Sequence, residues 1–118
     1  MTKLKLTVIT RNQKLKDKAQ KLSELIISTL SIDSLPHIDK YPKFNDSFKI
    51  TFTFDWDSTK NLTHHMIEIA DRLSTPWTTY FDRATDSVDL IYNKTDSSQI
   101  RRNEFNVIDW AELQIDEE

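Results

Sequence analysis

The chain of 118 residues contains no glycine and no cysteine. At average usage a chain of this length would hold about eight glycines. Phosphate-binding loops and dinucleotide-binding turns need backbone that approaches a phosphate with no side chain in the way, so the sequence argues against the common nucleotide-binding enzymes. The Gly-x-Ser-x-Gly turn of many hydrolases is excluded for the same reason. The lack of cysteine excludes disulfides, thiol catalysis and cysteine-ligated zinc.

Long apolar runs are missing as well. No stretch approaches the roughly 20 apolar residues of a membrane span, and residues 1–8 alternate instead of forming the apolar core of a signal peptide. With 37% hydrophobic and 30% charged residues, the composition is typical of a globular protein. We therefore expect a single domain over residues 1–118, located in the cytoplasm, with no cofactor, no small-molecule substrate and no membrane partner.

The clearest structural signal lies in residues 47–56. Large apolar side chains occupy every second position in this stretch, whereas lysine, threonine and aspartate occupy the positions between them. The apolar residues are Phe48, Ile50, Phe52, Phe54 and Trp56. A helix would place these side chains on opposite sides of its axis, so the pattern predicts a strand with one buried face.

Further strands and two helices are expected around this strand. The strands are predicted at residues 3–10, 77–82, 87–93 and 106–115, with a possible short edge strand within 31–46. The first helix would be capped by Asn12 and bury a stripe of Leu15, Ala19, Leu22, Ile26 and Leu30. The second would be capped by Asp57 or Ser58 and end before Pro76. This order (strand, helix, strand, helix, three strands) predicts an α+β fold: a two-layer sandwich with a mainly antiparallel sheet of about five strands and two main helices.

Few side chains are placed to carry chemistry. Asp55 and Asp57 have the i, i+2 spacing of a carboxylate pair that could hold Mg²⁺ in a nuclease, although Asp57 could instead cap a helix. His64 and His65 are adjacent, unlike the i, i+4 pair of a zinc site. One of them, or His37, could act as a general base, but histidines at surfaces are more common. We therefore expect no metal site, no catalytic residue and no enzyme activity.

Charge is divided unevenly along the chain. Residues 1–43 carry nine Lys or Arg and four acids, a net charge of +5, whereas residues 44–118 carry seven bases and fifteen acids, a net charge of −8. Acids that share one face of the sheet would attract a basic partner, although acids scattered for solubility are the alternative. The predicted partner-binding residues are Asp82, Asp86, Asp89, Asp109, Trp110 and Glu112. Trp77 and Trp110 could each be core residues or interface anchors.

The lysines of the first helix suggest a different function. Lys14, Lys16, Lys18 and Lys21 could form a nucleic-acid-binding patch. This patch contains no interleaved aromatic residue, and beyond Arg11 the segment has no arginine. A solvated helix face is the simpler interpretation. A nucleic-acid-binding module is thus the first alternative function, and a metal-dependent nuclease using Asp55 and Asp57 is the second.

In size, lack of cysteine, α+β order and the acidic stretch Asn-Glu-Phe-Asn-Val-Ile-Asp-Trp-Ala-Glu from Asn103, the chain resembles bacterial immunity proteins that neutralise contact-dependent growth inhibition toxins. The resemblance covers the whole chain in general character and involves no shared motif, so it implies a role but no residue. That role is a protein inhibitor that binds a cognate basic toxin domain, such as a nuclease, and covers its active site. The +5 segment would then face away from the toxin or meet an acidic patch on it.

Overall fold

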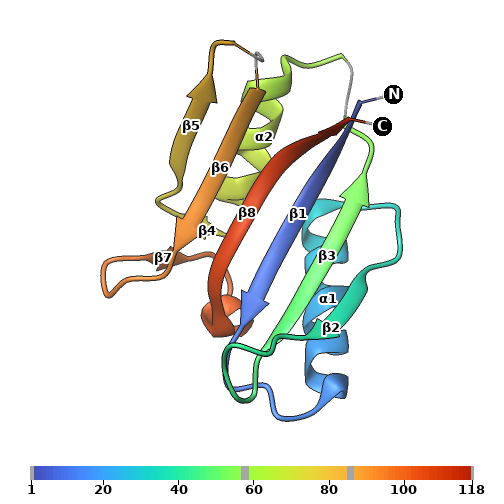
Figure 1. The fold of residues 1–118 in the computed structure, drawn as a ribbon, viewed down its shortest axis with the longest axis vertical. Helices are drawn as coiled ribbons and strands as arrows, with labels where there is room; N and C mark the ends of the chain where they lie inside the picture. Colours follow the sequence, from blue (N-terminus) through green and yellow to red (C-terminus); the bar gives the residue numbers. More distant parts are fainter. Residues whose placement is uncertain (1, 57–58, 85–86, 118) are drawn as a thin grey trace.

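The first strand, β1 (Thr2–Thr10), and the last, β8 (Ile108–Glu117), lie side by side at the centre of a six-stranded sheet (Figure 1). The structure is a computed structural model that describes residues 2–56, 59–84 and 87–117. The remaining strands of this sheet are β2 (His37–Lys40), β3 (Phe48–Phe54), β5 (Thr78–Asp82) and β6 (Ser87–Asn93). Their spatial order is β2, β3, β1, β8, β6, β5, and every neighbouring pair is antiparallel.

Two helices, α1 (Lys16–Leu30) and α2 (Leu62–Asp71), lie on the same face of this sheet (Figure 1). α1 packs against β3, and α2 packs against β6. A small second sheet pairs β4 (Ser74–Thr75) with β7 (Gln99–Ile100), and a 3₁₀ helix, η1 (Asn103–Val107), leads into β8. The predicted α+β sandwich of helices on an antiparallel sheet is therefore confirmed. The main sheet has one strand more than the five expected, because β2 forms its edge.

The core lies between the sheet and the helices, and β3 contributes its largest side chains. Phe48, Ile50, Phe52 and Phe54 are buried, whereas Lys49 between them is exposed. The same alternation holds in β6 and in the middle of β8, whereas in β1 every residue from Leu6 to Thr10 is buried. The predicted period-2 pattern is confirmed, except that Trp56 follows the end of β3 and packs against the core from outside the strand.

The predicted cap of the first helix is wrong. Asn12 adopts a positive φ of 60°, and the helix begins only at Lys16, so Leu15 is the cap residue and its side chain is exposed rather than part of the buried stripe. The chain is held away from helical geometry before this point. Arg11 N donates to Val107 O and Gln13 N donates to Asp46 O, both at 2.9 Å. These tertiary hydrogen bonds outweigh the local preference of asparagine for a helix cap.

The second helix also begins later than expected. Its cap is Asn61, whose side-chain oxygen accepts a hydrogen bond from His64 N at 3.1 Å. The predicted caps, Asp57 and Ser58, lie outside the described residues. The last strand was predicted at 106–115 and instead begins after η1, at Ile108. In the part of the chain that the structure describes, no helix is long and apolar enough to cross a membrane.

Candidate functional site

The face of the main sheet that points away from α1 and α2 is here called the open face. Both helices lie behind the sheet in Figure 1, and no described helix covers its other side. The strand register decides which side chains share this face. On β1 and β8 they include Lys5, Thr7, Ile9, Trp110, Glu112 and Gln114. On β6 and β5 they are Asp89, Ile91, Asn93, Thr78, Tyr80 and Asp82.

Most of the predicted partner-binding residues lie together on this face. Asp82 belongs to β5, Asp89 to β6 and Glu112 to β8, so three strands that are neighbours in the sheet each contribute one acid. These three residues are here called the acidic strip. Asp109 and Trp110 lie nearer the start of β8. The sixth predicted residue, Asp86, lies outside the described residues.

The acids of this face differ in how free they are. Asp109 Oδ2 forms an ion pair with Arg11 Nε at 2.7 Å, and Asp82 Oδ1 accepts a hydrogen bond from Ala84 N at 2.9 Å. Burial raises the pKa of Glu112, and the nearby carboxylate of Asp89 raises it further, while Lys5 acts in the opposite direction. Ionisation of Glu112 thus costs more free energy than ionisation of a fully exposed glutamate, and a cation placed beside it would lower that cost.

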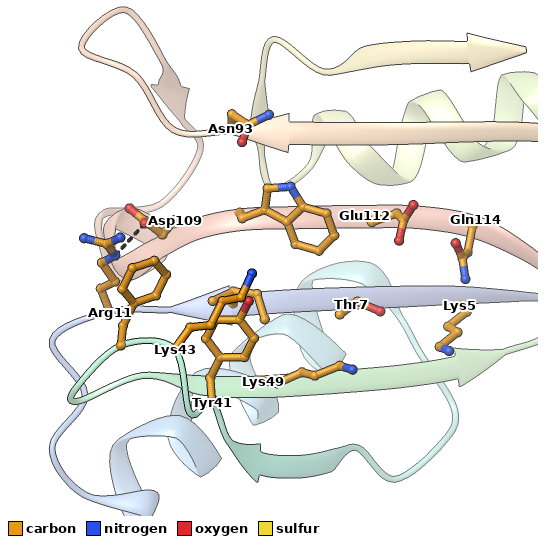
Figure 2. A pocket seen from close by; sticks show the side chains of 13 residues that line it. Lys5, Thr7, Arg11, Tyr41, Lys43, Lys49, Asn93, Asp109, Glu112 and Gln114 are labelled. Atoms are coloured by element: carbon orange, nitrogen blue, oxygen red, sulfur yellow. Dashed lines mark ion pairs between the residues drawn. The ribbon is translucent and has the colours of Figure 1, made fainter.

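A hollow of about 540 Å³ lies at one end of the open face, between β8 and the turn that joins β2 to β3 (Figure 2). One wall is fixed by ring and ion contacts. The guanidinium of Arg11, held by Asp109, lies 4.0 Å from the ring centre of Phe44, and the Phe44 and Tyr41 ring centres are 5.9 Å apart. Trp110 also lines the hollow. An aromatic and cationic recess therefore adjoins the acidic strip.

Cations occupy the other half of the open face. Lys5 on β1, Lys49 on β3 and Lys43 in the β2–β3 turn line the hollow opposite Glu112 (Figure 2). The face is therefore positive over β1 and β3 and negative over β8, β6 and β5. Binding of a basic toxin to the open face would require the basic N-terminal segment to point away from that face. Only part of the segment does so. The exposed lysines of α1 lie in the helix layer, whereas Lys5 and Arg11 share the open face.

The two tryptophans have different surroundings. Trp77 Nε1 donates to Ser74 O at 2.8 Å, and its ring centre lies 5.6 Å from that of buried Tyr92, so Trp77 has a structural role. Trp110 is half-buried on the open face, where its cross-strand neighbour is Ile9. Ile9 is only 6% exposed although no described helix covers it. Trp110 therefore keeps part of its ring at the surface of the open face, whereas Trp77 packs against the core.

The structure adds nothing to the other candidate sites among the residues that it describes. Asp55 is exposed after the end of β3 and Asp57 lies outside the described residues. Among the described residues no group of three or more metal-ligating side chains could hold a metal ion. His37 pairs with Asp39 at 2.9 Å and His64 with Glu68 at 3.0 Å, both at the surface.

The lysines of α1 face a second, smaller depression. Lys18 and Lys21 line it together with Leu22, Leu25 and the acidic Glu104, and no aromatic residue is among its lining side chains. A nucleic-acid site of this kind would gain much of its affinity from bases stacked on aromatic rings. The depression therefore does not add to the argument for nucleic-acid binding.

The residues of the β2–β3 turn were not predicted to be functional. Tyr41, Lys43 and Phe44 fall in the connection at 31–46, for which the sequence predicted only a possible short edge strand. The available signal was the sequence Tyr-Pro-Lys-Phe, two aromatic residues and a cation beside a central strand. Comparisons of the chain with protein-family models, with curated proteins and with solved structures found no match.

Proposed function

We propose that this protein is an immunity protein: an inhibitor that binds a basic bacterial toxin domain with its open face and covers the active site of that toxin. One observation supports the proposal most. Asp82 and Asp89 lie on the two paired strands β5 and β6, and Glu112 comes from β8, the last strand of the chain. The three acids thus share neighbouring strands beside Trp110 on a sheet face that no described helix covers. A strip of one charge beside a half-buried aromatic residue is typical of a protein-binding surface.

The two parts of this surface have different roles in binding. The acids attract the positive toxin from a distance and speed association, because their field extends over about one Debye length. Trp110 has a large apolar ring beside the hollow, so it loses water-exposed surface when a partner packs on the open face. Glu112 would gain from a cation of the partner, since burial and Asp89 raise its pKa in the free protein.

If the acidic strip covered the active site of a nuclease, the nuclease would be inhibited. Nucleases that bind a phosphate backbone need cations at their active site. An acidic protein face competes for these cations and excludes the substrate sterically. The inhibitor would act in the cytoplasm, where the substrate of such a toxin lies, and bind its cognate toxin one to one.

The test begins with the reading frames beside the one that encodes this chain. A C-terminal toxin domain encoded there is expressed from an inducible promoter in a test bacterium, with or without this protein. We expect growth to stop without the protein and to be restored with it. Replacing Asp82, Asp89 and Glu112 together by lysine should abolish both protection and complex formation by the purified proteins.

The matched control reverses three exposed acids elsewhere, Glu24, Asp33 and Asp96, and makes the same change of net charge. This control variant should still protect. Protection by the first variant, or equal loss in both, would contradict binding through the acidic strip. A salt-sensitive affinity for DNA or RNA that disappears when Lys14, Lys18 and Lys21 are replaced would instead establish the nucleic-acid-binding alternative.

A further inference from the structure

The outer edge of β5 is an unprotected strand edge. β5 pairs with β6 on one side only, and it is the last strand in the order of the main sheet (Figure 1). All of its residues, Thr78–Asp82, are exposed, including the large rings of Tyr80 at 55% and Phe81 at 56%. A free edge presents backbone N–H and C=O groups to any strand that can align with it.

The opposite edge of the sheet is protected. β2 has only four residues, and three of them, His37, Asp39 and Lys40, have polar or charged side chains. Short strands with charged side chains discourage pairing with another strand. β5 has five residues, Thr-Thr-Tyr-Phe-Asp, with no lysine or proline and a continuous register with β6. The two edges therefore differ in the features that prevent strand addition, and only β5 remains available.

A small depression adjoins this edge on the helix side of the sheet. Its volume is about 160 Å³, and Ile67, Ala70, Trp77 and Leu90 line it, with Thr79 of β5 among them. Ile67 is 48% exposed there. Thr79 and Phe81 point to this same side, because their partners on β6 are the buried residues Leu90 and Val88. An apolar side chain from an added strand would thus find an apolar site next to Thr79.

We propose that the free edge of β5 pairs with β5 of a second copy of this chain, antiparallel and centred on Tyr80. Tyr80 is the middle residue of Thr78–Asp82, so a two-fold axis there pairs Tyr80 with itself. The same register places Thr79 opposite Phe81 and Thr78 opposite Asp82. The sheet then continues through both copies.

The side chains of β5 are complementary to themselves in this register. Phe81 of each copy lies opposite Thr79 of the other, beside the apolar depression that Thr79 lines. The two Tyr80 rings meet on the open-face side. Each Asp82 faces a threonine, Thr78, rather than the Asp82 of the other copy, so no like charges are opposed. This match at all positions favours a second copy over a foreign strand.

The dimer leaves the open face accessible. The two-fold axis that relates two antiparallel edge strands is perpendicular to the plane of the sheet. The helices of both copies therefore lie on one side of the joined sheet, and both open faces lie on the other. The dimer shares Asp82 with the acidic strip but does not cover the open face, so one dimer presents two acidic strips. If the chain proved to be a monomer, the proposed inhibitor function would still stand.

Disulfide cross-linking tests the register directly, because the chain has no cysteine of its own. Cα atoms directly opposite in an antiparallel pair are about 4.5 or 5.5 Å apart, within the range that a disulfide spans. The Tyr80→Cys variant should therefore form a covalent dimer under mild oxidation. Thr78→Cys alone and Asp82→Cys alone should not, because each new thiol lies about 13 Å along the strand from its counterpart. A mixture of these two variants should cross-link, with Tyr80 and Phe81 intact.

Sedimentation of the full chain gives the second measurement. Between about 1 μM and about 1 mM the unmodified protein should shift from monomer to dimer, and Phe81→Asp should weaken dimerisation about tenfold or more. Leu35→Asp is the control, since Leu35 is 93% exposed and lies outside β5. It should dimerise normally.

Three results would overturn the proposal. These are a monomer over the whole concentration range, a dimer that Phe81→Asp leaves intact, and cross-linking at Thr78→Cys alone that equals cross-linking at Tyr80→Cys. If the protein stays monomeric but the amides of β5 become protected from hydrogen exchange when a toxin domain is added, a foreign strand occupies this edge instead.

Discussion

The two faces of the main sheet are made of alternate residues of the same strands, but they are buried in different ways. On the face beneath the helices, Ile50 and Phe52 of β3 are fully buried under a second layer. On the open face, Thr7 and Ile9 of β1 are only 7% and 6% exposed, with no described helix above them. Neighbouring side chains of the same sheet, including Trp110, provide that burial.

This difference separates stability from recognition. The covered face has one packing solution, because a shift of one residue in register would turn its aromatic side chains to solvent. The open face carries opposite charges over its two halves and an aromatic recess at one end, and none of these is required to form the core. Substitutions on the covered face should therefore change folding, and substitutions on the open face should mainly change binding.

The largest expected effect comes from placing a charge on the covered face. Phe52→Asp would bury an unpaired carboxylate at a fully buried position and cost more than about 4 kcal/mol, enough to unfold a domain of this size. Thr53→Asp, on the next residue of the same strand, should cost less than about 1 kcal/mol, because its cross-strand neighbour is Lys5. Circular dichroism and urea denaturation measure both. If both substitutions lowered the free energy of unfolding equally, both faces of β3 would be covered.

The two tryptophans give the next comparison. Trp110→Ala should weaken binding of the toxin domain by about 2 kcal/mol or more, mainly through faster dissociation, with a smaller loss of stability. Trp77→Ala should lower the free energy of unfolding by about 2 kcal/mol, because it removes the contact with Tyr92 and the hydrogen bond to Ser74, and should leave affinity unchanged. Calorimetric titration and denaturation of each variant separate the effects. Loss of affinity in proportion to loss of stability would place Trp110 in the core.

Smaller effects are expected when the acids of the open face are neutralised. Asp89→Asn should slow association roughly three- to tenfold at low salt and reduce its salt dependence, while dissociation changes little. Asp109→Asn should slow association less, because Arg11 already pairs with that carboxylate. Stopped-flow measurements at several salt concentrations give these rates. An equal effect at both positions would show that the ion pair with Arg11 does not shield Asp109.

The smallest effect concerns the protonation of Glu112. Its pKa is raised in the folded protein, so the folded state holds this proton more tightly than the unfolded chain. Its contribution to stability is then fully present below the ordinary glutamate pKa and is lost as pH rises through the raised pKa. Glu112→Gln should therefore stabilise the protein at neutral pH by less than about 1 kcal/mol and have almost no effect in acid. Thermal unfolding from acid to neutral pH measures this difference. Destabilisation at neutral pH would contradict the cause assigned to the shift.

Much of the fold was predictable because its signals are local. Alternation along β3, β6 and β8 identifies the strands and divides their residues between two faces, which puts Trp110 and Glu112 on the face opposite to Leu113. The helix starts were predicted poorly. The true cap of α2, Asn61, lies only a few residues from the predicted ones, whereas the start of α1 depends on hydrogen bonds to Asp46 and Val107.

The sequence by itself determined which side chains each strand presents to each face, because side chains alternate strictly along a strand. The tertiary structure alone decided which strands are neighbours. Pairing β1 with β8 places Lys5 and Glu112 on the same open face, and the β2–β3 turn brings Phe44 within reach of Arg11. These contacts join residues far apart in the chain, so no local pattern records them. The charge division of the open face, its hollow and the free edge of β5 all follow from strand order, which packing of the whole chain decides.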